Sequence, residues 1–433
     1  MEPLSLDLGG AGRFGHVLGR RSFLKAAGAC GLSWLTPVGH LLARQAEQAG
    51  RKDPGQAVIL LWLAGGPSQL ETFDPHPGTS IAAGTGAIAT DLKGVQLAEG
   101  FDGLAEQMDS VSLIRSMVSK EGDHERGTYL VKTGFRPDPT VVHPSIGAIC
   151  CHELPVGKTD IPRHISILPG PWPSRGGYLG DEYDAFKTGD PAQKVPDVTP
   201  QVPEARDQQR VRDLDIVEKA FAKGRQTRVE STLHLATVQR ARAMMTSDQL
   251  KAFDIKQEPL KLRQAYGDNE FGRACLAARR LVEVGVRCVE VTLSGWDSHA
   301  NNHEIHRKLV ATLDPAFSTL LRDLKERNLL QRTVVLCMGE FGRTPRVNAL
   351  AGRDHWPKGF SMAVAGGGIR AGKVIGATDP EGTKDPVDPV AVEDVHATVL
   401  TALGLDPSKV FTTPIGRTVK LSEGRPIRAL LGA

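Results

Sequence analysis

The chain has 433 residues, of which 24% are charged, and its formal net charge is only +3. So small an excess of positive charge does not favour binding to nucleic acid or to an acidic membrane surface. Residues 1–50 hold five Lys or Arg against three Asp or Glu, so the remainder is close to neutral. That remainder is long enough for one large α/β domain with an insertion.

The first 49 residues have the order of an export signal. Arg20 and Arg21 precede SFLKAAGACGLSWL, in which small and apolar residues predominate. This pattern is typical of a twin-arginine signal peptide, and we expect its removal within 43–49. Cys30 offers lipid attachment as an alternative, although its surroundings match a lipobox poorly. No later stretch approaches the ~18 apolar residues that span a bilayer. We therefore expect a soluble protein, exported by the twin-arginine machinery to the periplasm or secreted, with no membrane span in the mature chain.

Six short apolar segments predict strands along the rest of the chain. They begin near Ala57, Ser110, Arg163, Val286, Thr333 and Phe360. Near-continuous apolar runs of this length suit a sheet that is buried on both faces. Between them lie helical patterns, of which the clearest covers 306–328 with one apolar stripe. The alternation predicts an α/β fold: a mostly parallel central sheet with helices on both faces.

One long segment interrupts this alternation. Residues 169–203 are rich in Pro, Gly and Asp, and 204–283 have helical patterns. We interpret 50–433 as one α/β domain with a Pro/Gly-rich and helical insertion at about 169–283. Five cysteines follow the signal segment, an odd number, and Cys288 and Cys337 lie inside apolar strands, where a thiol behaves as a small hydrophobic group.

Polar side chains follow the predicted strands where the strands end. Asp297 and His299 come after the strand from Val286, Glu340 follows the strand from Thr333, and His355 lies one loop later. In open parallel sheets, ligands bind just beyond the carboxyl ends of the strands. We predict a divalent metal site here, and mixed His and carboxylate ligation suits Zn or Mn better than Ca.

Four further residues near this edge have weaker patterns. Arg343 and Arg353 flank the predicted ligands, where they would either clamp a sulfate or phosphate bidentately or form structural salt bridges. His303 and His306 lie at helical spacing near the start of a helix. We expect these two histidines to be solvated or to cap the helix.

Several segments together resemble a known bacterial family. They include LLWLAGGPSQLETFDPHPG, GDHERGTYLVKTGFRP, VEVTLSGWDSHANN, VVLCMGEFGRTPRVN and GRDHWPKGFSMAVAGGG. In this order they are similar to the exported family known as domain of unknown function 1501, over essentially all of 57–433. That family resembles the sulfatase and alkaline phosphatase superfamily. DVHATVLTALGL is similar to the helix that ends many sulfatase cores, so the resemblance implies an alkaline phosphatase/sulfatase-like fold.

The resemblance also implies roles for individual residues. Asp297 and His299 match the Asp and His that bind one metal in phosphatase-like members, and His355 stands where the last metal-binding His is expected. Glu340 occupies the position of a strand-end metal Asp. After the first strand, where members usually have Asp, this chain has AGGPSQLETFD, which leaves Glu71 as a candidate ligand.

The nucleophile is the largest departure from the superfamily. HERGTYLVKTG aligns with the sulfatase segment that carries the nucleophile, and His124 falls on that position. A covalent ester intermediate needs a Ser, Thr or Cys there. Either Thr128 or Ser68 serves, or water on the metal attacks directly, or no hydrolysis occurs. His124 itself would then be a metal ligand or a general acid/base.

Two functions remain open at this point. The first is an exported metal-dependent hydrolase of sulfate or phosphate esters, acting on a small-molecule or glycan ester. The alternative is a non-catalytic sulfatase-like protein that binds a surface glycan or a partner. The four metal-type residues favour the first function, and the missing Asp after strand one and His124 at the nucleophile position favour the second.

Overall fold

The computed structural model describes residues 56–225 and 234–432. The twin-arginine signal expected at 1–49, with its cleavage region and Cys30, lies outside these residues. Within the described residues, no helix has the length and apolarity to cross a bilayer.

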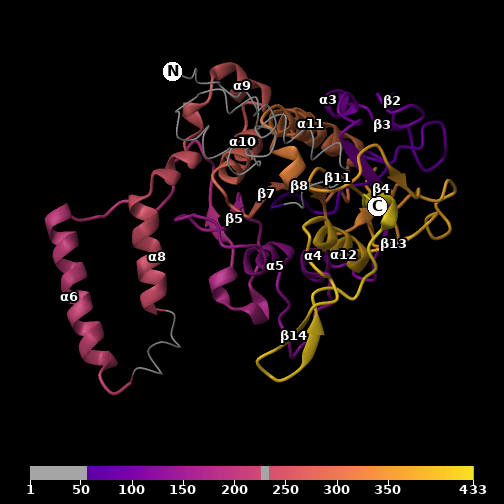
Figure 1. Cartoon of the computed structure of the whole chain (residues 1–433). Coiled ribbons are helices and arrows are strands. Elements are labelled where there is room, and N and C mark those ends of the chain that lie inside the picture. The colour runs from indigo at the N-terminus through magenta and orange to yellow at the C-terminus, as the bar shows by residue number, and fades with distance from the viewer. Residues whose placement is uncertain (1–55, 226–233, 433) are drawn as a thin grey trace, which may run out of the picture. The chain divides into compact units, whose positions relative to one another are not determined.

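A nine-stranded sheet forms the centre of the domain (Figure 1). All six predicted strands are present: β1 (Ala57–Ala64), β4 (Val111–Val118), β5 (His164–Ile167), β7 (Cys288–Ser294), β8 (Thr333–Met338) and β11 (Phe360–Ala365). Three short strands complete it: β6 (Phe186–Thr188), β12 (Val374–Ile375) and β13 (Val390–Ala391). The order is β12-β4-β11-β8-β1-β7-β5-β6, with β13 also paired to β4.

The sheet is mostly parallel, as predicted. β1 lies at its centre, in parallel register with β7 on one side and β8 on the other. β11 is the exception, because it runs antiparallel to both β8 and β4. The carboxyl ends of β1, β7 and β8 therefore lie at one edge of the sheet, and their following loops meet there.

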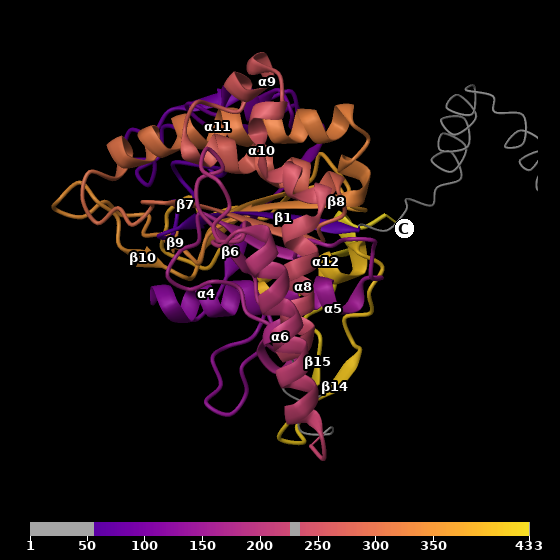
Figure 2. The ribbon, with the colours of Figure 1, turned by 90° about the vertical axis from the view of Figure 1, so that its left-hand side faces the viewer.

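Helices cover both faces of this sheet (Figure 2). One face carries α3 (Asp102–Ala105), α9 (Leu260–Ala265), α10 (Glu270–Glu283) and α11 (Asn302–Glu326). The other carries α4 (His124–Thr133), α5 (Ile146–Glu153) and α12 (Val392–Ala402). Alternate β1 residues pack into the two cores: Ile59, Leu61 and Leu63 face the first helix layer, and Val58, Leu60 and Trp62 face the second. This is the period of two that a strand buried on both faces requires.

Small elements lie around the core. Three two-stranded sheets pair β2 (Ala87–Ala89) with β3 (Gln96–Ala98), β9 (Gly342–Arg343) with β10 (His355–Trp356), and β14 (Val410–Thr412) with β15 (Thr418–Lys420). Short 3-10 helices cover Gly177–Leu179, Asp181–Tyr183, Asp248–Phe253, Ile255–Gln257, Leu330–Arg332 and Arg428–Leu430. The five cysteines of the described residues are all buried and unpaired, Cys288 and Cys337 among them.

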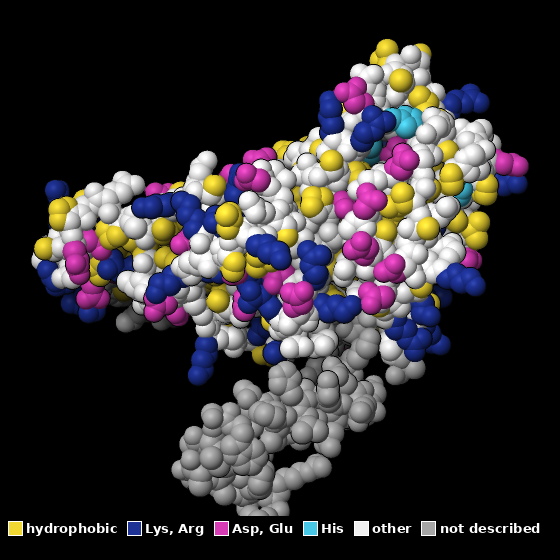
Figure 3. Space-filling view, turned by 90° about the horizontal axis from the view of Figure 1, so that it is seen from above, with side chains coloured by type: hydrophobic (Ala, Val, Ile, Leu, Met, Phe, Trp, Pro, Cys, Tyr) yellow, Lys and Arg dark blue, Asp and Glu magenta, His cyan; other side chains and the backbone are white. Residues whose placement is uncertain are grey.

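Only part of the insertion predicted at about 169–283 lies apart from the core of the domain. α6 (Glu204–Ala222) and α8 (His234–Thr246) project away from the sheet (Figure 1), and α6 buries none of its residues. α10, by contrast, belongs to the core, because Leu276 and Leu281 are buried in the first helix layer. On the face that Figure 3 shows, Lys and Arg are interspersed with Asp and Glu, without a large area of one sign.

Candidate metal centre

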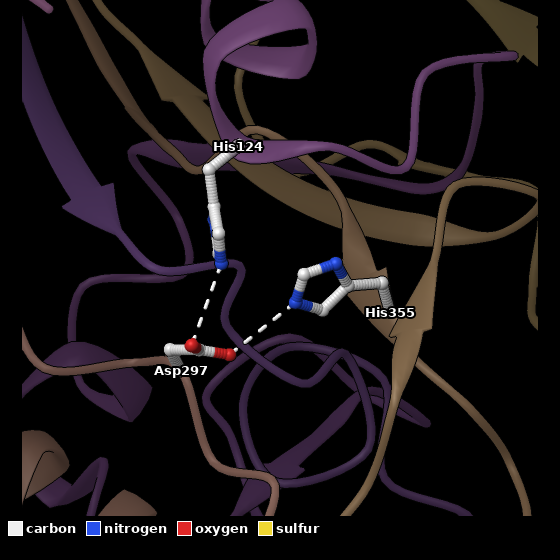
Figure 4. Close-up of side chains that lie close together, drawn as sticks. All are labelled: His124, Asp297 and His355. Carbon is white, nitrogen blue, oxygen red and sulfur yellow. Dashed lines mark hydrogen bonds and ion pairs between the residues drawn. The ribbon is translucent and has the colours of Figure 1, made fainter.

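Three side chains from separate parts of the chain converge at the carboxyl edge of the sheet. His124 begins α4, directly after Asp123, whose carboxylate caps the helix by accepting from the Arg126 amide. Asp297 lies in the loop after β7, and His355 lies in β10, which is held against β9. Figure 4 shows both imidazoles pointing at the Asp297 carboxylate. Within the described residues, one ligand atom from each of the three lies within 4.8 Å of the other two.

The separations between these atoms suit a shared ion. Asp297 Oδ2 lies 3.5 Å from His124 Nε2, and Asp297 Oδ1 lies 3.3 Å from His355 Nε2. His299 Nε2 lies 3.1 Å from the same Oδ1 and 3.1 Å from His355 Nε2. Two ligand atoms on a tetrahedral Zn²⁺, each at about 2.0 to 2.1 Å, are themselves about 3.3 Å apart. The cluster therefore has the spacing of a ligand set.

The three histidines have the same hydrogen-bond pattern, because Nδ1 of each contacts a carbonyl or carboxylate oxygen. His355 Nδ1 donates to the Gly122 carbonyl at 2.7 Å, and His299 Nδ1 lies 3.0 Å from Asp354 Oδ1. His124 Nδ1 lies 2.7 Å from Glu340 Oε1. A carbonyl or carboxylate accepts only, so each Nδ1 donates, and in the neutral imidazole each Nε2 is left with a lone pair. The Nε2 atoms of His124 and His355 thus face the Asp297 carboxylate, with His299 Nε2 beside His355 and Asp297, an arrangement that a cation stabilises.

Glu340 lies behind His124 rather than beside the ligand atoms. Its Oε1 accepts from the Gly65 amide at 2.9 Å as well as from His124, and its Oε2 is buried without a hydrogen-bond partner among the described residues. Glu340 was expected as a ligand, but the structure makes it the acceptor that orients a ligand. This hydrogen bond raises the pKa of His124, against the opposing effect of burial.

Arg343 orients Asp297. Its guanidinium is fully buried, donates to Asp297 Oδ1 at 2.6 Å, and gives three further hydrogens to the carbonyls of Gly65, Gly66 and Arg353. Partial burial acts to raise the pKa of Asp297, but the Arg343 contact outweighs it and the pKa is lowered. Four of its five guanidinium hydrogens are engaged and the side chain is fully buried, so for Arg343 the structure favours the structural salt bridge over the anion clamp.

Glu71 and Arg353 form a closed pair away from this cluster. Arg353 is fully buried, and its Nη2 and Nε donate to Glu71 Oε1 at 2.8 and 3.1 Å. Its remaining hydrogens reach the carbonyls of Thr344, Pro345 and Ile81. The structure therefore corrects two expectations: Glu71 does not join the metal-type cluster, and Arg353 is not free to clamp an anion. The two buried charges form an ion pair with each other instead.

The two histidines at the start of α11 differ from each other. His306 is buried, its Nε2 accepts from the Ser68 amide at 2.8 Å, and its Nδ1 donates to the Asn302 carbonyl at 3.0 Å. Burial lowers the pKa of His306 to about 4, so the expected solvated residue is wrong in this case. His303 is partly exposed and lies 3.3 Å from Glu71 Oε1.

The structure separates the two hydroxyl candidates. Ser68 is fully buried and its Oγ accepts from the Leu70 amide at 3.3 Å, so it is not available as a nucleophile. Thr128 lies one turn after His124 in α4 and lines a cleft of about 530 Å³. Residues four apart share a helix face, so the Thr128 hydroxyl lies on the His124 side of α4.

Asp354 is the one contributor that the sequence reasoning did not single out. It fixes His299 through Nδ1 and holds the Asn348 amide, with Oδ1 to Nδ2 at 3.2 Å. Its signal was present in GRDHWP, where it directly precedes His355. An acidic neighbour of a candidate ligand was readable as an orienting residue.

The fold and the site together define an α/β protein with a mainly parallel sheet and a candidate His/Asp metal centre at its carboxyl edge. The chain belongs to the family described as Protein of unknown function (DUF1501), whose model matches residues 55–431. The resemblance read from the sequence is thereby confirmed. No curated protein matches the chain.

Several solved structures are similar at low identity. A protein in the alkaline phosphatase superfamily from Vibrio parahaemolyticus is 11% identical, with a TM-score of 0.35, and the match covers 88% of this chain and 71% of that one. A TAB5 alkaline phosphatase mutant with Mg bound is 13% identical (TM-score 0.35; 82% and 100% covered). The PsFucS1 sulfatase from Pseudoalteromonas sp. is 14% identical (TM-score 0.33; 84% and 70% covered). The chemistry of this chain must therefore be argued from its own residues.

Proposed function

We propose that this protein is a metal-dependent hydrolase of sulfate or phosphate esters. One observation carries the proposal: the Nε2 atoms of His124 and His355 and the Asp297 carboxylate lie within 4.8 Å of one another, with each imidazole Nδ1 already bonded elsewhere and His299 Nε2 next to Asp297 and His355. The donor set of nitrogen and carboxylate oxygen fits Zn²⁺ or Mn²⁺, and is a poorer match to Ca²⁺, which prefers six to eight oxygens. The Glu340 carboxylate lies behind His124, where its Oε1 accepts from His124 Nδ1.

The residues of the cluster and their neighbours have separate roles that suit ester hydrolysis. A bound ion supplies Lewis-acid polarisation of an ester oxygen and lowers the pKa of water. His124, His355, His299 and Asp297 hold the site, and Arg343 fixes the carboxylate. Glu340 holds the Nδ1 proton of His124. Thr128, the hydroxyl on the His124 side of α4, is the candidate for a covalent step.

Metal analysis and an ester panel test this proposal. We expect about one Zn²⁺ or Mn²⁺ per chain, a lower melting temperature on chelation, and hydrolysis of an aryl sulfate, a phosphomonoester or a phosphodiester. Asp297→Asn and His355→Ala should each abolish metal binding and activity. His152→Gln is the matched control, because His152 is similarly exposed (30% against 24% for His355), forms its ion pair with Glu153 and lies outside the cluster. Wild-type metal content in Asp297→Asn would sink the proposal.

One observation favours a second candidate, a non-catalytic protein that binds a glycan or a partner. Among the described residues, no Ser or Thr hydroxyl hydrogen-bonds to His124, Asp297 or His355, and Ser68 is fully buried. Metal binding without turnover of any ester in the panel, together with ligand binding that Asp297→Asn weakens, would support this candidate. Turnover that requires Thr128 or metal would exclude it.

We also propose that the protein is exported by the twin-arginine pathway, on the evidence of its first 49 residues. Replacing both Arg20 and Arg21 by Lys should leave the precursor inside the cell while the wild-type chain appears in the periplasmic or secreted fraction. Unchanged export of the double variant would contradict the proposal.

A further inference from the structure

A cleft of about 530 Å³ lies beside α4. Its walls come from α4, from 137–145 and from 171–175. Thr128 lines it one helical turn from His124. The Trp172 ring, also in the wall, lies 6.5 Å from the His124 ring with the planes at 11°. The cluster residues do not themselves line the cleft, but the Trp172 wall brings the cleft next to His124.

The lining combines flat apolar surface with polar groups. Trp172 is 37% exposed, and Tyr129 and His143 lie further along the wall. Exposed Glu125 and Arg175 are also part of the lining, and neither forms an ion pair within the described residues. Aromatic faces with a few polar groups are typical of small-molecule sites of this volume. Faces for C–H groups beside groups for hydroxyls suit a sugar ring better than a wholly apolar ring.

A buried ion pair holds the Trp172 segment in place. Lys132 Nζ donates to the Trp172 carbonyl at 3.0 Å and to Glu290 Oε1 at 2.9 Å. Ser174 Oγ donates to Glu290 Oε2 at 2.6 Å. Lys132 and Glu290 are both buried, and an ion pair costs desolvation that a pair of apolar residues would not. What this pair achieves is a fixed wall, since it ties 172–174 to α4 and β7 before any ligand arrives.

We propose that this cleft binds the sugar ring of a sugar ester, with the ring against Trp172 and the ester group at His124 and Asp297. The orientation of the ester rests on the proposed hydrolase function, and the cleft adds the substrate class. The ring site itself depends only on Trp172, its fixed segment and the polar lining. Sugar binding and metal-dependent hydrolysis can therefore fail separately.

Calorimetric titration of the wild-type chain and of Trp172→Ala tests the cleft. The probes are glucose, galactose, and their 6-sulfates and 6-phosphates, with inorganic phosphate as the ring-free probe. We expect Trp172→Ala to weaken sugar-ester binding by about tenfold, which corresponds to about 1.4 kcal/mol, because the sugar ring loses the aromatic face against which it packs. Inorganic phosphate should bind both chains equally. Phe221→Ala is the matched control, because Phe221 is a 58% exposed aromatic on α6, outside the cleft lining, and its loss should change nothing.

The outcomes separate the two proposals. Sugar-ester binding that Trp172→Ala weakens, in a chain that binds no metal and hydrolyses nothing, keeps the cleft and removes the hydrolase. Equal binding of sugar esters by wild type and Trp172→Ala, or no binding of any of them, overturns the cleft whatever the metal analysis gives. An equal loss of inorganic phosphate binding in Trp172→Ala also overturns it, because the residue would then act on the anion site and not on the ring. Circular dichroism of each variant verifies the fold.

Discussion

Asp297 and Glu71 make an instructive pair. Both carboxylates follow strands at the same edge of the sheet, β7 and β1, and both were expected to bind metal. Each contacts a buried arginine, Arg343 for Asp297 and Arg353 for Glu71. The Asp297 side chain is nevertheless 46% exposed and also faces the Nε2 atoms of His124 and His355, whereas that of Glu71 is 4% exposed. A carboxylate that is enclosed with its cation contributes to stability, and one that stays exposed beside imidazole nitrogens is accessible to an external ion.

The largest effect is expected when the buried ion pair between Glu71 and Arg353 is removed. Arg353→Met should destabilise the chain by about 3 to 5 kcal/mol, because it removes the buried cation that pairs with buried Glu71. Urea unfolding measures the loss, and metal content per folded chain should stay at the wild-type value. Arg346→Met is the control, since Arg346 is exposed, and it should shift stability by less than about 0.5 kcal/mol. A loss below about 1 kcal/mol for Arg353→Met would mean that Glu71 is not held by its partner.

Lowering the pH should reduce the stability of the fold through two buried histidines, His306 and His396. Burial lowers the pKa of His306 and of His396 to about 4, below the value of about 6.5 in an unfolded chain. The unfolded state therefore takes up protons first, and stability is fully present above pH 6.5 and falls toward pH 4. Between pH 7.5 and 5 each histidine should cost about 2 kcal/mol.

Denaturant unfolding at several pH values checks this expectation. His396→Gln keeps a donor for the Val131 carbonyl, which His396 Nε2 reaches at 2.8 Å, but removes one titrating group. Its loss of stability between pH 7.5 and 5 should be about 2 kcal/mol smaller than that of the wild-type chain. The same pH slope in both chains would contradict the assignment.

The smallest expected effect concerns the exposed site around Asp297, where Glu340 orients His124. Glu340→Gln should keep the fold and lower metal affinity by about 10- to 100-fold, since the residue orients His124 without being a ligand. Competition with a chelator of known affinity measures the change. Abolished binding, as expected for Asp297→Asn, would instead return Glu340 to the ligand set.

The six long strands were predictable because each is a near-continuous apolar run that the two-faced sheet requires. The antiparallel direction of β11 was not, because an apolar run has no direction, and β12 and β13, at two residues each, have no pattern of their own. Strand-end position sufficed to single out Asp297, His299 and His355. Whether Arg343 and Arg353 meet carbonyls or solvent depends on packing, and the contact of His124 with Glu340 spans 216 positions. Only the fold decides such contacts.

The central position of β1 has a consequence for synthesis. This strand is the first of the sheet to be made, yet its neighbours are β7 and β8, with Val58 opposite Cys288 and Val334. At ribosomal rates of about 5 to 20 residues per second, β1 waits on the order of 10 to 50 s for its first neighbour. Through that interval eight consecutive apolar residues, AVILLWLA, have both edges unpaired and are open to association with other chains. The nascent chain is therefore most vulnerable before residue 288 emerges, and the metal-type cluster forms only after that interval, because Asp297, His299 and His355 all follow it.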